Sequence, residues 1–298
     1  MRIIKPKSWR EFGLAKISAY NMGYGNFRTG EVMTARIRDE AGPRAFMLIS
    51  GPLDARPTKS TRFHTHLIEL GEAGGMAPHD VRPFWHTYLG PAVIWAYATG
   101  RGPRGGVVWG QRYAPLDLVK LKVYDIREIP RPPGVSHKNV IPHDDVIIYH
   151  PGRRETMCWW DLEVIKNLQP LEIDIRGGSV PLRITPEWSL AAFHTTTLTM
   201  QGYVYEGWLG FVDNSGIAYE PMFLDTDELI ATCGLTPPSW ETRKIKSVVF
   251  PMGIRESART GNYEVISGIQ DQATYIIEIN KSDISAGLAE LSATLKGA

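Results

Sequence analysis

Residues 189–212 read SLAAFHTTTLTMQGYVYEGWLGFV, and this stretch decides the kind of fold that the chain adopts. It contains two runs, 189–200 and 203–212, that are rich in β-branched and aromatic residues. Such side chains suit the pleated, half-buried surface of a β-strand. Similar runs recur along the chain and predict an almost entirely β protein. They cover residues 31–39, 44–50, 62–70, 91–99, 116–126, 145–150, 246–252, 263–269 and 274–279.

Turn-forming residues separate these runs. The chain has 29 glycines and 21 prolines, and clusters such as residues 39–43 and 213–216 combine them with Asp or Asn. Glycine permits positive φ, proline presets φ, and Asn and Asp close local turns. The best amphipathic helix covers residues 282–295, with Ser282 or Asp283 as its N-cap, and a weaker helical turn covers residues 225–229.

Many short strands separated by turns indicate a sandwich, a barrel or a propeller. Consecutive sandwich domains would require linkers, and the only linker-like run is the proline-rich segment 130–133, which could equally be a rigid loop. We therefore expect one domain over residues 1–298. This length is within reach, because all-β single domains often run to about 200–250 residues or more.

The composition is that of a folded protein with a near-neutral surface. Hydrophobic residues make up 43% of the 298 residues, and the net charge is +1, which argues against a nucleic-acid binder. Cys158 and Cys233 fit two buried thiols in a reducing compartment, although a single bridge stays open. With no apolar run of about 18 residues and no signal-peptide core, we expect a cytoplasmic protein without a membrane partner.

Several short motifs follow one another in a characteristic order. The sequence reads YNMGYGNFRTGEVMTARIR at 20–38, HDVRPF at 79–84, KNLQP at 166–170, RGGS at 176–179, HT at 194–195, VVFPMG at 248–253 and GIQD at 268–271. This ordered set resembles the five-bladed β-propellers of the β-mannoside phosphorylase superfamily, which also contains hydrolases and phosphorylase-like mannosyltransferases. The resemblance implies an all-β fold: a five-bladed β-propeller with a short C-terminal helix.

The chain departs from the family pattern at several positions. His79 stands where an acidic residue is usual, Val81 where proline is usual, and Leu168 replaces tryptophan. Only five residues separate Pro170 from Arg176, which predicts a shortened blade there. The departures leave open the substrate and the retention of activity.

Cleavage or formation of a glycosidic bond requires a proton donor for the bridging oxygen. The resemblance implies that Asp80 is this general acid, acting directly or through a sugar hydroxyl. Desolvation by Phe84 and Trp85 would raise the pKa of Asp80. The alternative is a structural pair with Arg82, which would lower that pKa.

A phosphate or sugar-nucleotide co-substrate requires a cationic pocket. Lys166, Arg176 and His194 fit this need, because Arg binds phosphate oxygens bidentately, Lys acts as a point charge and a protonated His donates from its ring. They lie in separate segments that a propeller could bring together on its axis. The alternative is two solvated side chains, Lys166 and Arg176, and a histidine at the edge of the core.

Charged and planar side chains are the expected ligands of sugar hydroxyls. Arg36, Arg82 and Asp271 are the candidates for this role. Tryptophans could stack on sugar faces, although burial against a sheet is the commoner fate of this residue. The candidates are Trp85, Trp109, Trp159, Trp160 and Trp208.

His64 and His66 would share one face of a strand, and such a pair can bind a metal. Because no third ligand is evident, we interpret them as surface histidines and expect no metal and no cofactor.

Three functions are consistent with these residues. The first is inverting transfer that makes or breaks a β-mannosidic bond, with an oligosaccharide or sugar-phosphate substrate and with inorganic phosphate or a sugar nucleotide as co-substrate. The second is a glycoside hydrolase, which needs a carboxylate base such as Glu155, Glu163 or Glu220. The third is a propeller that binds glycans or a protein without turnover. A homo-oligomer stays open.

Overall fold

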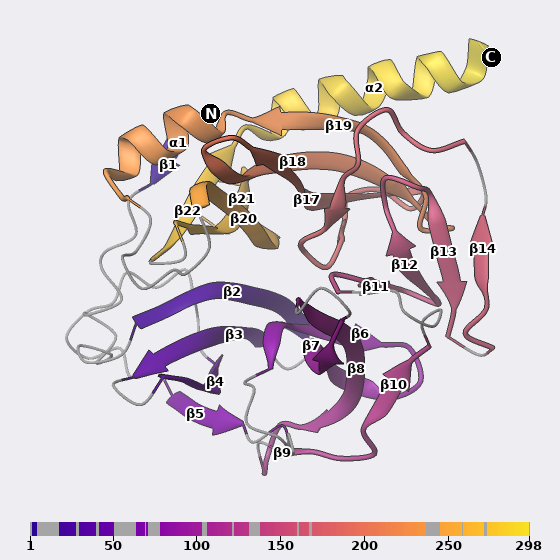
Figure 1. Cartoon of the computed structure of the whole chain (residues 1–298). Helices are drawn as coiled ribbons and strands as arrows, with labels where there is room; N and C mark the ends of the chain where they lie inside the picture. Colours follow the sequence, from indigo (N-terminus) through magenta and orange to yellow (C-terminus); the bar gives the residue numbers. More distant parts are fainter. Residues whose placement is uncertain are drawn as a thin grey trace.

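The computed structural model of the chain describes residues 2–4, 18–27, 30–39, 42–50, 64–68, 70, 78–102, 106–120, 122–130, 138–159, 161–166, 169–236, 245–257, 259–270 and 273–297. Strands dominate these residues, and two helices accompany them, α1 (Thr226–Cys233) and α2 (Lys281–Gly297) (Figure 1). The prediction of a mostly β protein with a C-terminal helix is therefore confirmed.

Three antiparallel sheets follow one another along the first half of the chain. The first consists of β2 (Ser18–Phe27), β3 (Gly30–Asp39), β4 (Gly42–Ser50) and β5 (His64–Ile68). The second consists of β6 (His79–His86), β7 (Gly90–Arg101), β8 (Val107–Asp117) and β10 (Arg127–Ile129), with β9 (Lys122–Val123) also paired to β8. The third consists of β11 (Ile141–His143), β12 (Val146–His150), β13 (Glu155–Cys158) and β14 (Val164–Lys166).

The second half of the chain forms one nine-stranded sheet. Its order is β1-β22-β21-β20-β18-β17-β15, with β16 paired to β17 and β19 paired to β18. Its strands are β1 (Arg2–Ile4), β15 (Arg176–Gly177), β16 (Leu182–Arg183), β17 (Trp188–Thr199), β18 (Gly202–Asp213), β19 (Ala218–Leu224), β20 (Ile245–Glu256), β21 (Tyr263–Ile269) and β22 (Ala273–Ile279).

The N-terminal strand β1 lies at the edge of this last sheet. It pairs antiparallel with β22, with Arg2 opposite Glu278 and Ile4 opposite Ile276. The two ends of the described chain therefore meet in one sheet.

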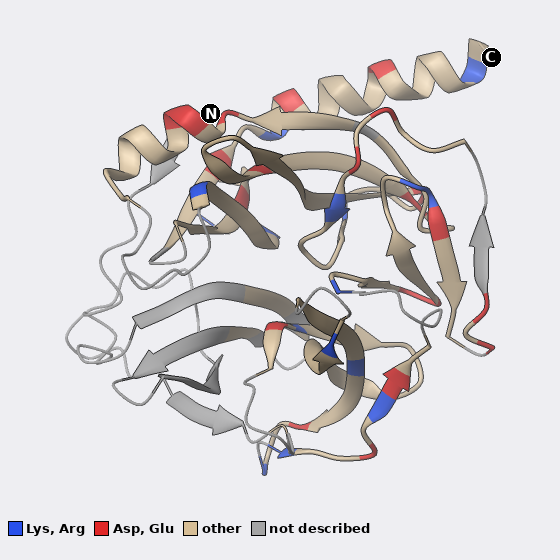
Figure 2. Ribbon diagram, in the orientation of Figure 1, with Lys and Arg blue, Asp and Glu red and all other residues tan. Residues whose placement is uncertain are grey.

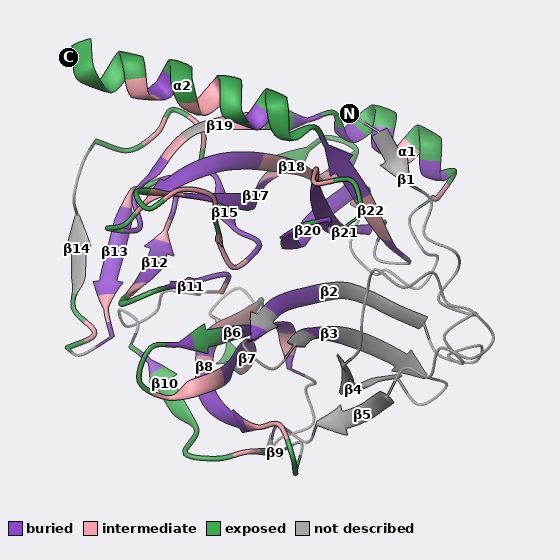
Figure 3. Ribbon diagram, turned by 180° about the vertical axis from the view of Figure 1, so that it is seen from behind, coloured by how far each residue is buried: buried purple, intermediate pink, exposed green. Residues whose placement is uncertain are grey.

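The sheets lie around a common centre, and β2, β6, β11 and β20 (Figure 1) and β15 (Figure 3) lie on their inner sides. Glycine is required at these contacts, because a Cβ on Gly23 would stand 2.3 Å from the Val81 carbonyl oxygen, and one on Gly177 would stand 1.8 Å from that of Asn139. Apolar side chains fill the space between neighbouring sheets, and exposed residues gather in turns and on the outer side of α2 (Figure 3).

Some local predictions were wrong. Residues 116–126 do not form one strand, because β8 ends at Asp117 and a turn follows it. The segment from Pro170 to Arg176 is a connection between β14 and β15, and the sheet before it has four strands. The expectation of two free thiols is confirmed, although only Cys233 is buried and Cys158 is partly exposed. Neither α1 nor α2 has the length and hydropathy of a membrane-crossing helix.

Candidate active site

Asp80 lies near the start of β6, and its side chain is buried. Its exposed fraction is 3%, and its backbone has a positive φ of 53°. The register between β6 and β7 shifts between His79 and Arg82, so a bulge re-aims the carboxyl. A positive φ costs an aspartate about 1–3 kcal/mol, and such strain is retained chiefly where a site needs it.

Arg82 holds this region together from inside. Its guanidinium is fully buried and donates from Nε to the Gly178 carbonyl oxygen, from Nη1 to the Asp80 carbonyl oxygen at 3.3 Å, and from Nη2 to Asn139 Oδ1 at 3.3 Å. Burial lowers the pKa of Arg82 to about 10, and the nearby Asp80 carboxylate opposes this shift. The expected contact of Arg82 with sugar hydroxyls is therefore corrected, because the group is enclosed by protein and acts as a positioning residue.

A chain of hydrogen bonds runs from Arg82 to His194. Because Arg82 donates to Asn139 Oδ1, the Asn139 amide presents its Nδ2–H to His194 Nε2, at 3.4 Å. His194 then carries its own proton on Nδ1, which is buried and has no partner among the described residues. Burial, followed by the charges of Lys138, Arg176 and Arg82, holds the pKa of His194 well below its usual value.

His194 is therefore neutral at pH 7 and 1% exposed. Its ring packs against Phe250 with centroids 4.3 Å apart. The expectation that a protonated His194 binds phosphate is corrected for both reasons. The His194 ring serves as a buried acceptor for the Asn139 amide.

Two of the cations whose charges act on His194 remain accessible. Lys138 Nζ lies 3.5 Å from Asp80 Oδ2 and 5.5 Å from the centre of the Trp109 ring, and the Lys138 side chain is 34% exposed. Arg176 begins β15, where it pairs in register with His194, and its side chain is 43% exposed. Its partner is Asp174 Oδ2 at 3.4 Å. Lys138 can therefore reach an anion beside Asp80, and Arg176 lies opposite His194 in the neighbouring strand.

Lys166 does not belong to this group. It ends β14, and the sheet order places three strand spacings between β14 and β11. At about 4.8 Å a spacing, this is about 14 Å from the strand that follows Asn139. A Lys–Asn pair does reach Asp80, but it is Lys138–Asn139. The signal that could have identified it is the same dipeptide placed directly before the apolar residues Val140 and Ile141.

The RGGS motif at 176–179 brings the backbone into the centre. Cβ atoms on Gly177 and Gly178 would stand 1.8 Å from the Asn139 oxygen and 2.5 Å from the Pro251 oxygen. Ser179 closes the turn, because its Oγ accepts from the Ala192 N–H at 2.8 Å. The motif thus places Arg176 at the site and the Gly178 carbonyl on Arg82.

Other candidates are placed only in part or lie elsewhere. Arg36 lies on β3 and Glu220 on β19, both with side chains outside the described residues, and Asp271 and Trp160 lie outside them altogether. Glu155 is buried in β13, and Glu163 is exposed. Within the described ranges, no group of three or more His, Cys, Asp or Glu side chains is arranged to hold a metal ion. Lys and Arg are spread over the described sheets together with Asp and Glu (Figure 2).

No protein-family model matches the chain, and no curated protein matches its sequence. Solved structures do match. A GDP-Man-dependent mannosyltransferase from Leishmania mexicana aligns with a TM-score of 0.57 and 13% identity over 94% of this chain and 89% of that one. A mannose phosphorylase from the same organism, in complex with phosphate ion, aligns with a TM-score of 0.55 and 13% identity over 90% and 86%. A β-1,2-mannobiose phosphorylase from Listeria innocua, in complex with β-1,2-mannobiose, aligns with a TM-score of 0.53 and 13% identity over 96% and 99%.

These matches identify the fold as a β-propeller. The chain shares this fold with the mannosyltransferase and the two phosphorylases, so the resemblance that the ordered motifs indicate is confirmed at the level of the fold.

Proposed function

We propose that the chain is a carbohydrate-active enzyme that makes or breaks a β-mannosidic bond by inverting transfer, with inorganic phosphate or an activated sugar as co-substrate. The observation that carries this proposal is the buried Asp80 carboxyl beside the accessible Lys138, with Arg176 opposite His194 in the neighbouring strand. It is supported by the fold shared with a mannosyltransferase and with a phosphorylase that binds phosphate ion.

We also propose that the propeller has five blades. The sheet pairings divide into five units that begin with β2, β6, β11, β15 and β20, the last completed by β1. Three of these units have four strands, and the short strands β9 and β16 give the other two a fifth. The nine-stranded sheet then joins two neighbouring blades through the parallel contact of β18 with β20.

The chemistry follows from the charges. In the phosphorolytic direction, an oxygen of phosphate attacks the anomeric carbon, the bond from that carbon to the bridging oxygen breaks, and Asp80 donates a proton to the bridging oxygen, directly or through a sugar hydroxyl. Lys138 and Arg176 hold the phosphoryl oxygens, Lys138 as a point charge and Arg176 as a planar fork. Arg36 and Asp271 stay our candidates for sugar hydroxyls.

The reducing compartment expected from the sequence is consistent with this assignment. Cys158 and Cys233 are unbridged, as is usual for cytoplasmic proteins. We propose that the enzyme acts there on soluble oligosaccharides or sugar phosphates.

The test measures phosphate released from mannose-1-phosphate in the presence of mannose or mannobiose, and in parallel the use of GDP-mannose. Asp80→Asn should lower turnover by about 10²–10⁴-fold, the usual contribution of a positioned general acid. Lys138→Ala should raise the KM for the phosphorylated donor, whereas the matched variant Lys166→Ala should not. Unchanged turnover of Asp80→Asn would refute the assignment, and cleavage of mannobiose without phosphate would replace it by a hydrolase.

A further inference from the structure

A cavity of about 250 Å³ lies on the other side of the central contacts from Asp80. We call it the Trp85 cavity. The side chains that matter in it are Tyr24, Phe84, Trp85, His143, Asp144 and Arg183.

Chain direction places the cavity far from the candidate active site. Asp80 begins β6, and Trp85 lies five residues further along it, about 15 Å at roughly 3.3 Å per residue. The segment that contains β11 runs in the same direction, since Asn139 precedes β11 and His143 is its last residue. Two segments therefore pass from the Asp80 end of the centre to the Trp85 cavity.

One wall of the cavity is aromatic. Tyr24 and Phe84 are buried, whereas Trp85 is 37% exposed and presents part of its indole to the cavity. A partly solvent-exposed indole is suited to stack on the apolar face of a ring whose edge carries polar groups.

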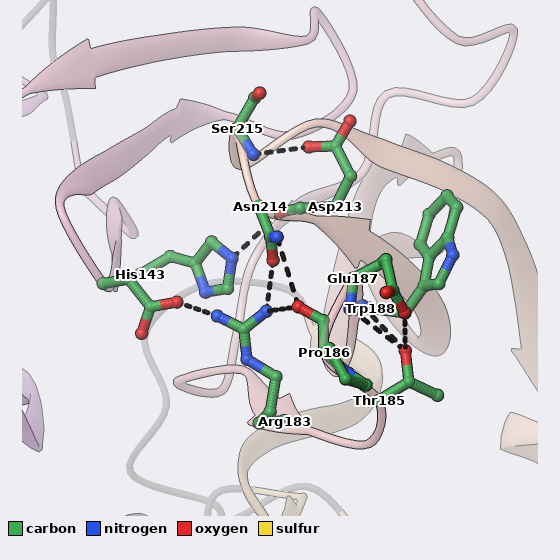
Figure 4. A network of polar contacts seen from close by, with 10 residues as sticks. His143, Arg183, Thr185, Pro186, Glu187, Trp188, Asp213, Asn214 and Ser215 are labelled. Carbon is green, nitrogen blue, oxygen red and sulfur yellow. Dashed lines mark hydrogen bonds and ion pairs between the residues drawn. The ribbon is translucent and has the colours of Figure 1, made fainter.

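The cavity is also lined by a guanidinium held in one orientation. Arg183 donates from Nη1 to Asn214 Oδ1 and to the Pro186 carbonyl oxygen at 3.1 Å, and from Nη2 to Asp144 Oδ2 (Figure 4). Asn214 donates in turn to the Pro186 oxygen at 3.2 Å. These bonds use three of the five donors, so Nε–H and one Nη2–H have no partner among the described residues.

His143 adds a neutral acceptor. Its Nε2 donates to the Asp213 carbonyl oxygen at 2.9 Å, and burial lowers its pKa, so that the ring is neutral and Nδ1 accepts. Because Asp144 offsets the charge of Arg183, an anion gains little here. A neutral ligand with several hydroxyl groups fits the aromatic wall, the two free donors and the acceptors together.

We propose that the Trp85 cavity binds one neutral saccharide residue, with the sugar face on Trp85 and its hydroxyls on Arg183, Asp144 and His143. It is a second saccharide site, remote from Asp80, that holds a glycan without converting it. Saccharide binding in the Trp85 cavity does not require turnover at Asp80.

The test uses the full chain labelled with 5-fluorotryptophan and observes its nine tryptophans by ¹⁹F NMR. Trp85→Phe and Trp109→Phe assign the two informative resonances, one at each end of the centre. β-1,2-Mannobiose should shift the Trp85 resonance in the wild type and in Asp80→Asn. Inorganic phosphate alone should leave it unshifted.

Arg183→Gln should weaken the mannobiose affinity reported by Trp85 by about tenfold, the effect of losing one key contact. The matched variant Tyr88→Phe changes an exposed aromatic outside the cavity lining and should leave it unchanged. An unshifted Trp85 resonance in the folded protein, or an affinity that Arg183→Gln does not alter, overturns the proposal. A shift of the Trp109 resonance without one of the Trp85 resonance would refute this site and leave the proposed function standing. A shift of the Trp85 resonance without one of the Trp109 resonance would support this site and count against the proposed function.

Discussion

Replacement of Arg82 by methionine tests whether the buried guanidinium stabilises the centre of the fold. Methionine has a similar length and keeps the apolar packing, but it has no N–H groups. Arg82→Met leaves three buried acceptors without their donor: the carbonyl oxygens of Gly178 and Asp80 and the Oδ1 of Asn139.

The magnitude follows from two opposing effects. Each orphaned buried acceptor costs about 1–3 kcal/mol, so the three together cost about 3–9 kcal/mol. Methionine also removes a buried charge, and the lowering of the pKa of Arg82 from 12.5 to about 10 corresponds to roughly 3 kcal/mol of burial cost. The expected loss of unfolding free energy is therefore about 3 kcal/mol, with a range of about 0–6 kcal/mol.

Thermal unfolding followed by circular dichroism measures this loss. At about 2–4 °C per kcal/mol, the midpoint should fall by about 6–12 °C. The control is Arg127→Met, because Arg127 is half exposed and paired with Asp125, and its loss should cost less than about 1 kcal/mol. A double variant of Arg82→Met with Asn139→Leu should lose less than the sum of the two single variants, since they share one bond. An Arg82→Met protein as stable as the wild type would refute the reasoning.

Three further perturbations have expected outcomes. Burial lowers the pKa of His150 to about 4, so the unfolded state binds the proton first as the pH falls. The stability contributed by the neutral His150 is full above pH 6.5 and falls by up to about 3 kcal/mol toward pH 4. Urea unfolding of the wild type and of His150→Asn across that pH range should show this part of the loss in the wild type only. Gly177→Ala should cost about 1–3 kcal/mol or more in the same assay, because its Cβ would overlap the Asn139 oxygen, whereas Gly106→Ala meets no atom and should be silent. Asp225→Ala removes the N-cap of α1, whose carboxylate accepts from the backbone of the first turn, and should lower stability by about 1 kcal/mol; no change in its melting temperature would contradict the cap.

Local chemistry predicted much of the fold. The runs at 189–200 and 203–212 became β17 and β18, because β-branched and aromatic residues suit the pleated sheet. The prediction of one strand over residues 116–126 was wrong for an equally local reason. Asp117 Oδ1 accepts the N–H groups of Val119 and Lys120 and closes a turn that the β-prone residues around it conceal.

The site was predicted less completely. Asp80 and Arg176 follow from their motifs, but the chain contains two Lys–Asn pairs, and only the position of β11 and β14 in their sheet decides that Lys138 reaches Asp80. The protonated state expected for His194 was wrong, because burial lowers its pKa. Its neutral state depends on burial and on surrounding cations that arrive from distant segments, and a sequence does not contain these distances.

The pairing of β1 with β22 delays the completion of the last sheet during synthesis of the chain. Arg2–Ile4 are synthesised long before their partners near Ile277. At about 5–20 residues per second, the first strand waits roughly 15–55 s for its partner. During that time the last sheet has an open edge, so its completion must be among the final events of folding. Removal of either β1 or β22 would remove this pairing, because each strand is the partner of the other.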